Sequence, residues 1–172
     1  LSFGATAQKI AGIAEGLRQA GVRRGDRIGV YLETSVLQAL SIFGVSQAGG
    51  VFVPINSLLF PDQVTHIGID CGMKGLITTS DKVASLAAVL RNISSLDFVV
   101  VTDKTENIEV APRVYDIDEF FALPVAQEWK DWNIGKDLAA ILYTSGSTGK
   151  PKGVMLSHEQ VMAGSAIVSD YL

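Results

Sequence analysis

With 172 residues, of which 48% are apolar and 19% are charged, the chain can bury one hydrophobic core and belongs to the globular class. Its net charge of -4 provides no basic stripe, which argues against nucleic acid as a partner. No apolar run approaches the roughly 18 residues that a membrane span requires, and the single cysteine, Cys71, excludes an intrachain disulfide. We therefore expect a cytoplasmic protein with no membrane span.

The first third of the chain predicts two units in which a helix precedes a strand. The first helix stops at Gly21, after which residues 27–32 form a short apolar run suited to a buried strand. A second helix, capped by Thr34 or Ser35, precedes a strand over residues 51–53. The residues at helical spacing that should face the core from these two helices are Ile10, Ile13, Leu17, Ala20, Leu37, Leu40 and Ile42.

The middle of the chain continues this alternation. Pro61 suits the first turn of a third helix, which Gly72 ends. Apolar runs at residues 75–79 and 98–102 predict two more strands, separated by a helix over residues 81–90. The apolar contacts expected from the third helix are those of Val64, Ile67 and Ile69.

Between residues 103 and 136 the pattern weakens into charged residues, prolines and tryptophans. We interpret this segment as an irregular surface excursion with one short strand near Val114 and Tyr115. Residues 138–143 then form another apolar strand, which runs directly into a glycine-rich segment. This alternation predicts a single α/β domain over residues 1–172, with a mostly parallel sheet and helices on both faces. In such sheets ligands gather at the carboxyl ends of the strands.

A polyphosphate-binding loop is indicated by the run Tyr143-Thr144-Ser145-Gly146-Ser147-Thr148-Gly149-Lys150-Pro151-Lys152-Gly153. Its glycines let backbone N–H groups turn toward one point, and its hydroxyls add further donors. Its two lysines supply positive charge, and hydrogen bonds to an ionised phosphate are stronger than neutral ones. We infer phosphate binding from this combination.

Two familiar phosphate-binding motifs do not fit this loop. A P-loop requires a glycine five residues before Gly149 and a hydroxyl after Lys150, but the chain has Thr144 and Pro151 at these positions. A dinucleotide fingerprint is excluded because no G-x-G-x-x-G lies between a strand and a helix. A flexible linker is the remaining alternative, but linkers rarely follow a buried strand or carry Lys-Pro-Lys.

The whole run at residues 143–153 resembles, position by position, the signature of the adenylate-forming (AMP-binding) superfamily. Its members are acyl-CoA synthetases, luciferases and the adenylation domains of peptide synthetases. Residues 21–28 and 49–56 resemble two stretches that precede this signature in acyl-CoA ligases, and residues 153–158 continue the ligase pattern. The resemblance covers most of the chain and implies part of the large N-terminal domain of an acyl-CoA synthetase-like fold.

The resemblance implies an AMP-forming acyl-CoA ligase. Such an enzyme activates a small-molecule carboxylic acid with ATP, releases pyrophosphate, and usually transfers the acyl group to the thiol of coenzyme A. By this resemblance Thr144 also contributes an oxygen to Mg²⁺, and Lys152 is the predicted catalytic residue, because fixed charge stabilises the departing pyrophosphate. Lys150 occupies a position that varies in the family. The residues expected around the β- and γ-phosphates are Thr144, Ser145, Gly146, Ser147, Thr148, Gly149 and Lys152.

Other chemically capable residues are interpreted as structural. Ser157 and Gln160 can form a capping box, so we assign His158 to a helix start rather than to the site. His66 lies in the middle of a predicted helix without a metal-ligand partner at suitable spacing. Cys71 has no catalytic signature and no paired cysteine around it and is expected to be inert, as a small buried hydrophobic residue.

The resemblance also implies that functional groups are missing. Full-length members carry, downstream of this signature, a magnesium-binding glutamate, a ribose-binding aspartate and a late catalytic lysine. We therefore expect an N-terminal fragment that binds ATP weakly, does not adenylate alone, and self-associates through uncovered apolar surface. Three alternatives stay open: an adenylation domain of a peptide synthetase, a non-catalytic nucleotide-binding or interaction module, and a different phosphate-handling enzyme.

Overall fold

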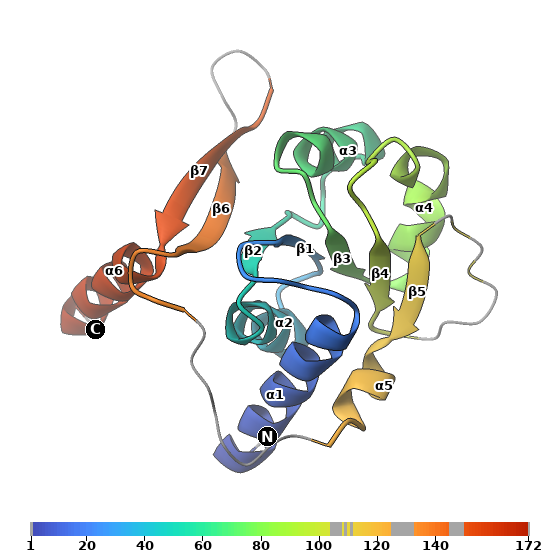
Figure 1. Cartoon of the computed structure of the whole chain (residues 1–172). Helices are drawn as coiled ribbons and strands as arrows, with labels where there is room; N and C mark the ends of the chain where they lie inside the picture. Colours follow the sequence, from blue (N-terminus) through green and yellow to red (C-terminus); the bar gives the residue numbers. More distant parts are fainter. Residues whose placement is uncertain are drawn as a thin grey trace.

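The computed structural model describes residues 2–103, 108, 110, 112–124, 133–144 and 150–171. Within these residues the chain forms a seven-stranded sheet with the order β5-β4-β3-β1-β2-β6-β7 (Figure 1). Its neighbouring strands are parallel except for the antiparallel pair β6 and β7, which confirms the predicted mostly parallel α/β sheet. The strands are β1 (Arg27–Tyr31), β2 (Val51–Pro54), β3 (Gly75–Thr78), β4 (Phe98–Val101), β5 (Arg113–Asp116), β6 (Leu138–Thr144) and β7 (Lys152–Ser157).

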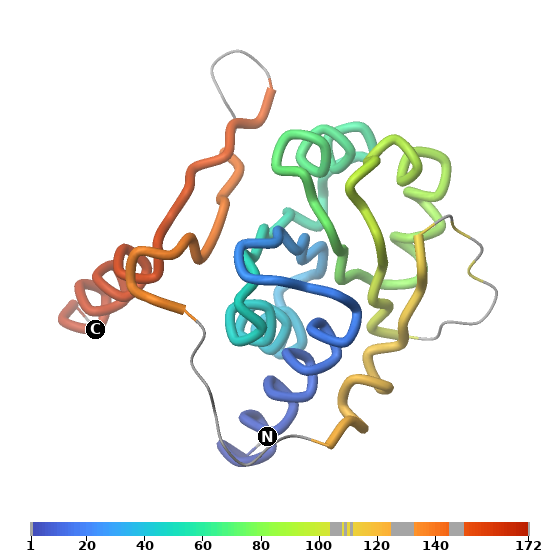
Figure 2. The backbone as a smooth tube through the Cα atoms, in the orientation of Figure 1, coloured from blue at the N-terminus to red at the C-terminus, as the bar shows by residue number. Residues whose placement is uncertain are grey.

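Helices cover both faces of this sheet, as predicted. One core lies beneath α3 and α4, and a second lies beneath α1, α2 and α5, whose paths can be followed in Figure 2. Ser35 caps α2, because its hydroxyl accepts a hydrogen bond from the N–H of Gln38 at 3.2 Å. The helices are α1 (Phe3–Gln19), α2 (Val36–Gln47), α3 (Pro61–Asp70), α4 (Ser80–Leu90), α5 (Ile117–Phe121) and α6 (His158–Tyr171).

Adjacent residues of the central strands face opposite cores. On β4, Val99 and Val101 join the core beneath α3 and α4, whereas Phe98 and Val100 join the core beneath α1, α2 and α5. This alternation follows from the two-residue period of a strand. Because both faces of these strands are covered, the strands read in the sequence as continuous apolar runs.

The segment predicted as an irregular surface excursion contributes a strand and a helix to the fold. β5 confirms the strand expected near Val114 and Tyr115, but the sequence did not predict α5. Ile117 and Phe120 of α5 are only 2% and 3% exposed, so this part of the prediction is wrong. A Cβ on Gly16 of α1 would lie 2.2 Å from Cγ of Phe120, which shows how closely the two helices approach. A helix of five residues is too short to show a helical period.

Ile69 also departs from expectation. It was expected to supply an apolar contact from α3, but it is 56% exposed, whereas Ile67 is fully buried. Residues i and i+2 of an α-helix are separated by about 200° around the helix axis. Ile69 therefore lies on the face of α3 that points away from Ile67.

The last described helix begins as the capping-box pattern predicted. The N–H of Ser157 donates to Oε1 of Gln160 at 2.8 Å, and the N–H of Gln160 donates to the Ser157 hydroxyl at 3.3 Å. α6 therefore begins at His158, and none of its described residues is buried. In the part of the chain that the structure describes, no helix is both long and apolar enough to cross a membrane.

Candidate functional site

The β6–β7 hairpin carries both ends of the predicted phosphate loop. Its strands pair with Thr144 opposite Lys152 and Tyr143 opposite Gly153. Side chains directly opposite each other in an antiparallel pair project from the same face. The structure therefore brings Thr144 and Lys152, both exposed, to one side of the hairpin. The other predicted site residues, 145–149, lie outside the described residues.

A hydroxyl and an ammonium on one face suit a polyphosphate. The hydroxyl of Thr144 can donate to a phosphate oxygen or offer an oxygen ligand to Mg²⁺, and the ammonium of Lys152 supplies a point charge. Within the described part of the chain, Lys152 has no ion-pair partner, so its charge is free to meet an anion. The same described residues contain no cluster of three His, Cys, Asp or Glu that could hold a metal.

The hairpin joins the sheet beside β2 and then runs toward α3. Phe52 of β2 pairs with Ala140 of β6, and beyond this pair the hairpin extends away from the sheet (Figure 1). The partly buried side chain of Tyr143 packs against the core beneath α3 and α4, and its hydroxyl donates to the carboxylate of Asp70. The chain thus leaves the carboxyl end of β6 for the loop beside the last turn of α3.

Two neutral groups lie where the hairpin meets α3. Burial raises the pKa of the Cys71 thiol to about 11, although the nearby charge of Arg27 lowers it in part. Burial, together with the hydrogen bond to Asp70, raises the pKa of Tyr143 above its ordinary value. Tyr143 therefore stays a hydrogen-bond donor at neutral pH, and Cys71 is not a thiolate nucleophile.

Sequence reasoning missed two residues that contact this hairpin. Nε2 of His66 lies 3.3 Å from the carbonyl oxygen of Pro151, the residue before Lys152, and Asp70 accepts a hydrogen bond from the hydroxyl of Tyr143, the residue before Thr144. These partners are 85 and 73 positions apart in the sequence. No local pattern links residues so far apart, so only the folded structure reveals the two contacts.

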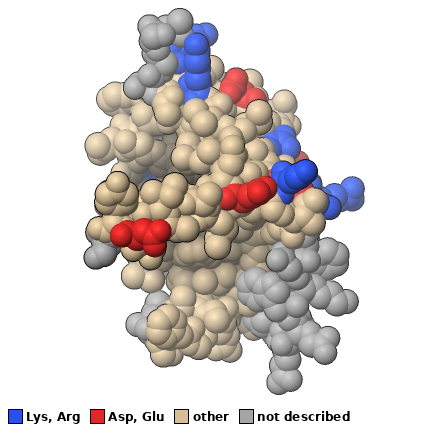
Figure 3. Space-filling model, turned by 90° about the vertical axis from the view of Figure 1, so that its left-hand side faces the viewer, with Lys and Arg blue, Asp and Glu red and all other residues tan. Residues whose placement is uncertain are grey.

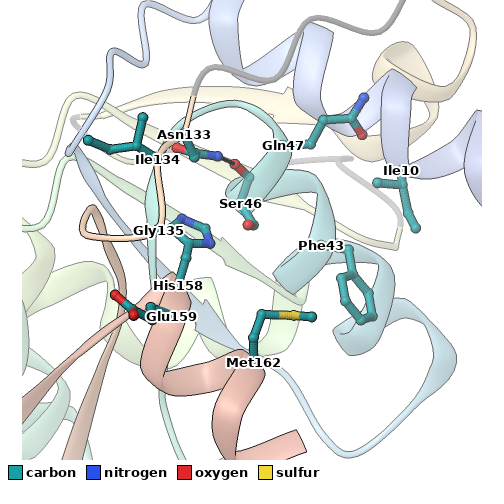
Figure 4. A pocket seen from close by; sticks show the side chains of 10 residues that line it. All are labelled: Ile10, Phe43, Ser46, Gln47, Asn133, Ile134, Gly135, His158, Glu159 and Met162. Atoms are coloured by element: carbon teal, nitrogen blue, oxygen red, sulfur yellow. Dashed lines mark hydrogen bonds between the residues drawn. The ribbon is translucent and has the colours of Figure 1, made fainter. Parts of the chain in front are cut away.

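A separate hollow of about 560 Å³ lies at the other end of the hairpin. In Figure 4, Phe43 and Met162 lie side by side at one end of it, and His158 projects into it from the start of α6. Nε2 of His158 and Oε1 of Gln47 are buried there without a hydrogen-bond partner among the described atoms. Because His158 follows β7 and Gly135 precedes β6, this hollow is remote from the predicted phosphate loop.

A wide apolar groove of about 900 Å³ lies between α6 and the strands β2, β6 and β7. The side of the molecule that includes α6 and β7 shows few charged residues across its centre (Figure 3). Large apolar side chains are also exposed on α6 and β7. Exposed apolar patches of this kind are typical of protein surfaces that contact another protein. The most exposed of them are Met155, Met162, Ile167 and Tyr171.

Comparisons with known proteins agree on one family. The model of the family described as AMP-binding enzyme matches residues 1–171. The feruloyl-CoA synthase of Amycolatopsis sp is 33% identical over 165 residues, which are 92% of this chain and 28% of that protein. Syringomycin synthase SyrB1 of Pseudomonas syringae pv. syringae is 36% identical over 152 residues, which are 87% of this chain and 21% of that protein.

Two solved structures share the fold of this chain. Coronafacic acid ligase from Pectobacterium brasiliense matches with a TM-score of 0.81 at 21% identity, over 94% of this chain and 31% of that one. ATP-bound MatB from Rhodopseudomonas palustris matches with a TM-score of 0.79 at 24% identity, over 99% of this chain and 32% of that one.

The chain has a mostly parallel α/β sheet, and the hairpin at one edge of this sheet carries the ends of the adenylate-forming signature. These two features define the adenylate-forming class. The chain belongs to the AMP-binding enzyme family, as the resemblance of its sequence implied. It spans 28% and 21% of the length of the two curated relatives described above.

Proposed function

We propose that this chain provides the part of an AMP-forming acyl-CoA ligase that grips the phosphates of ATP. The observation that carries the proposal is the hairpin that holds Thr144 opposite Lys152 at the two ends of the signature loop. Family membership and the likeness to a feruloyl-CoA synthase support it. Because those relatives are much longer than this chain, the complete reaction is assigned to a longer polypeptide.

In the proposed first step, a carboxylate oxygen attacks the α-phosphorus of ATP and the bond from that phosphorus to the bridging oxygen breaks. Pyrophosphate leaves with the bonding electrons, and an acyl-adenylate remains. Residues 144–149 and Lys152 surround the β- and γ-phosphates, and the charge of Lys152 stabilises the departing pyrophosphate. The Thr144 oxygen would hold Mg²⁺ in part, and the ion would supply further neutralisation of phosphate charge.

In the proposed second step, the sulfur of coenzyme A attacks the acyl carbonyl carbon, AMP leaves, and the thiol proton passes to solvent. The partners are thus a small-molecule carboxylic acid, ATP and coenzyme A, and no nucleic acid takes part. We place the reaction in the cytoplasm, where the thiols of coenzyme A and of Cys71 stay reduced.

A second candidate is the adenylation domain of a peptide synthetase. The 36% identity to syringomycin synthase favours it, and the first step would be the same. The acceptor would then be a thiol on a carrier protein rather than coenzyme A. Measuring which of the two acceptors receives a radiolabelled acyl group decides between the candidates.

The test of the proposed function uses the protein encoded by the complete reading frame. ATP–pyrophosphate exchange is measured over a panel of carboxylic acids, followed by thioester formation with coenzyme A. We expect exchange that depends on the acid supplied, and a thioester with at least one acid that supports exchange. Absence of exchange with every acid, from a folded protein that contains the complete reading frame, would contradict the proposal.

A further inference from the structure

The geometry points to a positioning role for two residues of α3, His66 and Asp70, which we name the anchor pair. They hold Tyr143 and Pro151, the residues next to Thr144 and Lys152, so that these two side chains are in place before a nucleotide binds. This inference rests on the proposed function, because the nucleotide is the ligand that the positioned loop would receive. The contacts themselves do not depend on it.

The anchor pair sits on a firmly packed helix. His66 and Asp70 are four positions apart, which places them on the same face of α3. Val64 and Ile67 of the same helix are fully buried in the core beneath α3 and α4. The backbone of α3 is thereby fixed to the sheet, and its side chains can serve as fixed points for the hairpin.

The residue that enters the loop is held by Asp70. The Tyr143 hydroxyl donates to the Asp70 carboxylate. Burial, together with this hydrogen bond, raises the pKa of Tyr143 above its ordinary value. Gly153, opposite Tyr143 in the hairpin, leaves the room that the ring occupies. A Cβ on Gly153 would lie 3.2 Å from Cζ and 3.4 Å from the hydroxyl oxygen of Tyr143, and 2.7 Å from Cγ2 of Ile141.

The residue that leaves the loop is held by His66. The carbonyl oxygen of Pro151 accepts from Nε2 of His66 at 3.3 Å in the tautomer that carries the Nε2 proton. The ring of Pro151 fixes its φ angle, so holding this carbonyl also orients the backbone that leads into Lys152. His66 therefore acts on the predicted catalytic lysine through the backbone.

The contacts of His66 and Asp70 leave the face of the hairpin that carries Thr144 and Lys152 uncovered. Successive side chains of a strand point to opposite faces. Tyr143 points toward α3, so Thr144 and its opposite partner Lys152 point away from α3. One face of the hairpin is thus bound to the scaffold while the other presents a hydroxyl and a cation. Fixing Tyr143 and Pro151 in advance lowers the conformational entropy that the backbone beside Thr144 and Lys152 loses when a nucleotide binds.

Hydrogen exchange tests the anchors without any nucleotide. In the protein of the complete reading frame, Asp70→Ala or His66→Ala is expected to speed amide exchange at residues 141–144 and 152–155 about five-fold, as for the loss of one hydrogen bond. The variants Asp70→Asn and His66→Gln retain an acceptor and a donor, so they should restore slower exchange. Asp81→Ala, an exposed carboxylate in the first turn of α4, is the matched control.

A double-mutant cycle distinguishes the loss of the bond between Tyr143 and Asp70 from a general destabilisation of the fold. Tyr143→Phe removes the bond to Asp70 from the other side and keeps the ring in place. Combined with Asp70→Ala it should add almost nothing to the exchange rate of either single variant. Additive effects in this cycle, or unchanged exchange in the double variant of His66 and Asp70, would overturn the anchor pair.

The nucleotide is then added to separate the two proposals. The KM for MgATP in pyrophosphate exchange should rise about five-fold in Asp70→Ala and His66→Ala, with a smaller change in kcat, and should recover in the two conservative variants. Faster amide exchange with an unchanged KM would overturn the positioning role alone. An enzyme that shows no acid-dependent exchange in its native form contradicts the proposed function, while the hydrogen-exchange result still decides whether the anchors exist.

Discussion

Replacing Gly153 by alanine is expected to destabilise the hairpin and to disturb the loop at the same time. The added Cβ would lie 2.7 Å from Cγ2 of Ile141 and 3.2 Å from Cζ of Tyr143, so one of these side chains must move. Overpacking of this kind costs about 1–3 kcal/mol. Alanine recovers about 0.5–1 kcal/mol of backbone entropy relative to glycine. The net loss in free energy of unfolding should therefore be about 1 kcal/mol, with limits of about 0 and 2.5 kcal/mol.

Gly164 of α6 provides the matched control, because a Cβ there would meet nothing within 4 Å. Gly164→Ala should therefore gain up to about 1 kcal/mol from helix propensity alone. Urea denaturation measures both variants, and the KM for MgATP reports on the loop. The reasoning fails if Gly153→Ala matches the native protein in both stability and KM, since Tyr143 would then not depend on the space above Gly153.

Three further predictions concern single residues and the isolated chain. Because burial raises the pKa of Cys71 to about 11, iodoacetamide should react with the folded protein only slowly at pH 8, where about one thiol in a thousand is ionised, and faster as the pH rises toward 11. A rate that levels off near pH 8.5 would contradict this. The chain of 172 residues alone should catalyse no acid-dependent pyrophosphate exchange, and measurable exchange would refute that expectation. The same chain should self-associate in sedimentation velocity. Self-association should weaken in Met155→Lys and Met162→Lys, because the native side chains are 67% and 68% exposed. A native chain that stays monomeric at high concentration would count against self-association.

The alternation of helices and strands over the first hundred residues could be predicted because the helices are long enough to show their period and the strands form apolar runs. β1, β3 and β4 are buried on both faces, whereas β2 is buried on one face and partly buried on the other, and all four read as apolar runs. Ser35 marks the start of α2 because its hydroxyl caps the helix. α5 was missed because its five residues make little more than one turn. Its burial depends on Gly16, about a hundred positions earlier in the chain.

The candidate site shows the same division between local and long-range information. Thr144 and Lys152 could be proposed as site residues because the signature is local. The structure shows only that they pair across the β6–β7 hairpin. β7 itself was not predicted, because residues 152–157 contain a glycine and lie at the edge of the sheet, where no continuous apolar run is needed. The anchor pair could not be found, because His66 and Asp70 lie on a helix far from the loop in sequence.

Pyrophosphate exchange by two lysine variants tests the central claim most directly. In the protein of the complete reading frame, with an acid that supports exchange, Lys152→Ala should lower the rate about 100-fold or more, as for the loss of a group that stabilises developing charge. Lys150→Ala, two positions away and also exposed, should stay within a few-fold of the native rate. Equal rates for the native protein and Lys152→Ala would contradict the assignment of this hairpin to the phosphates of ATP.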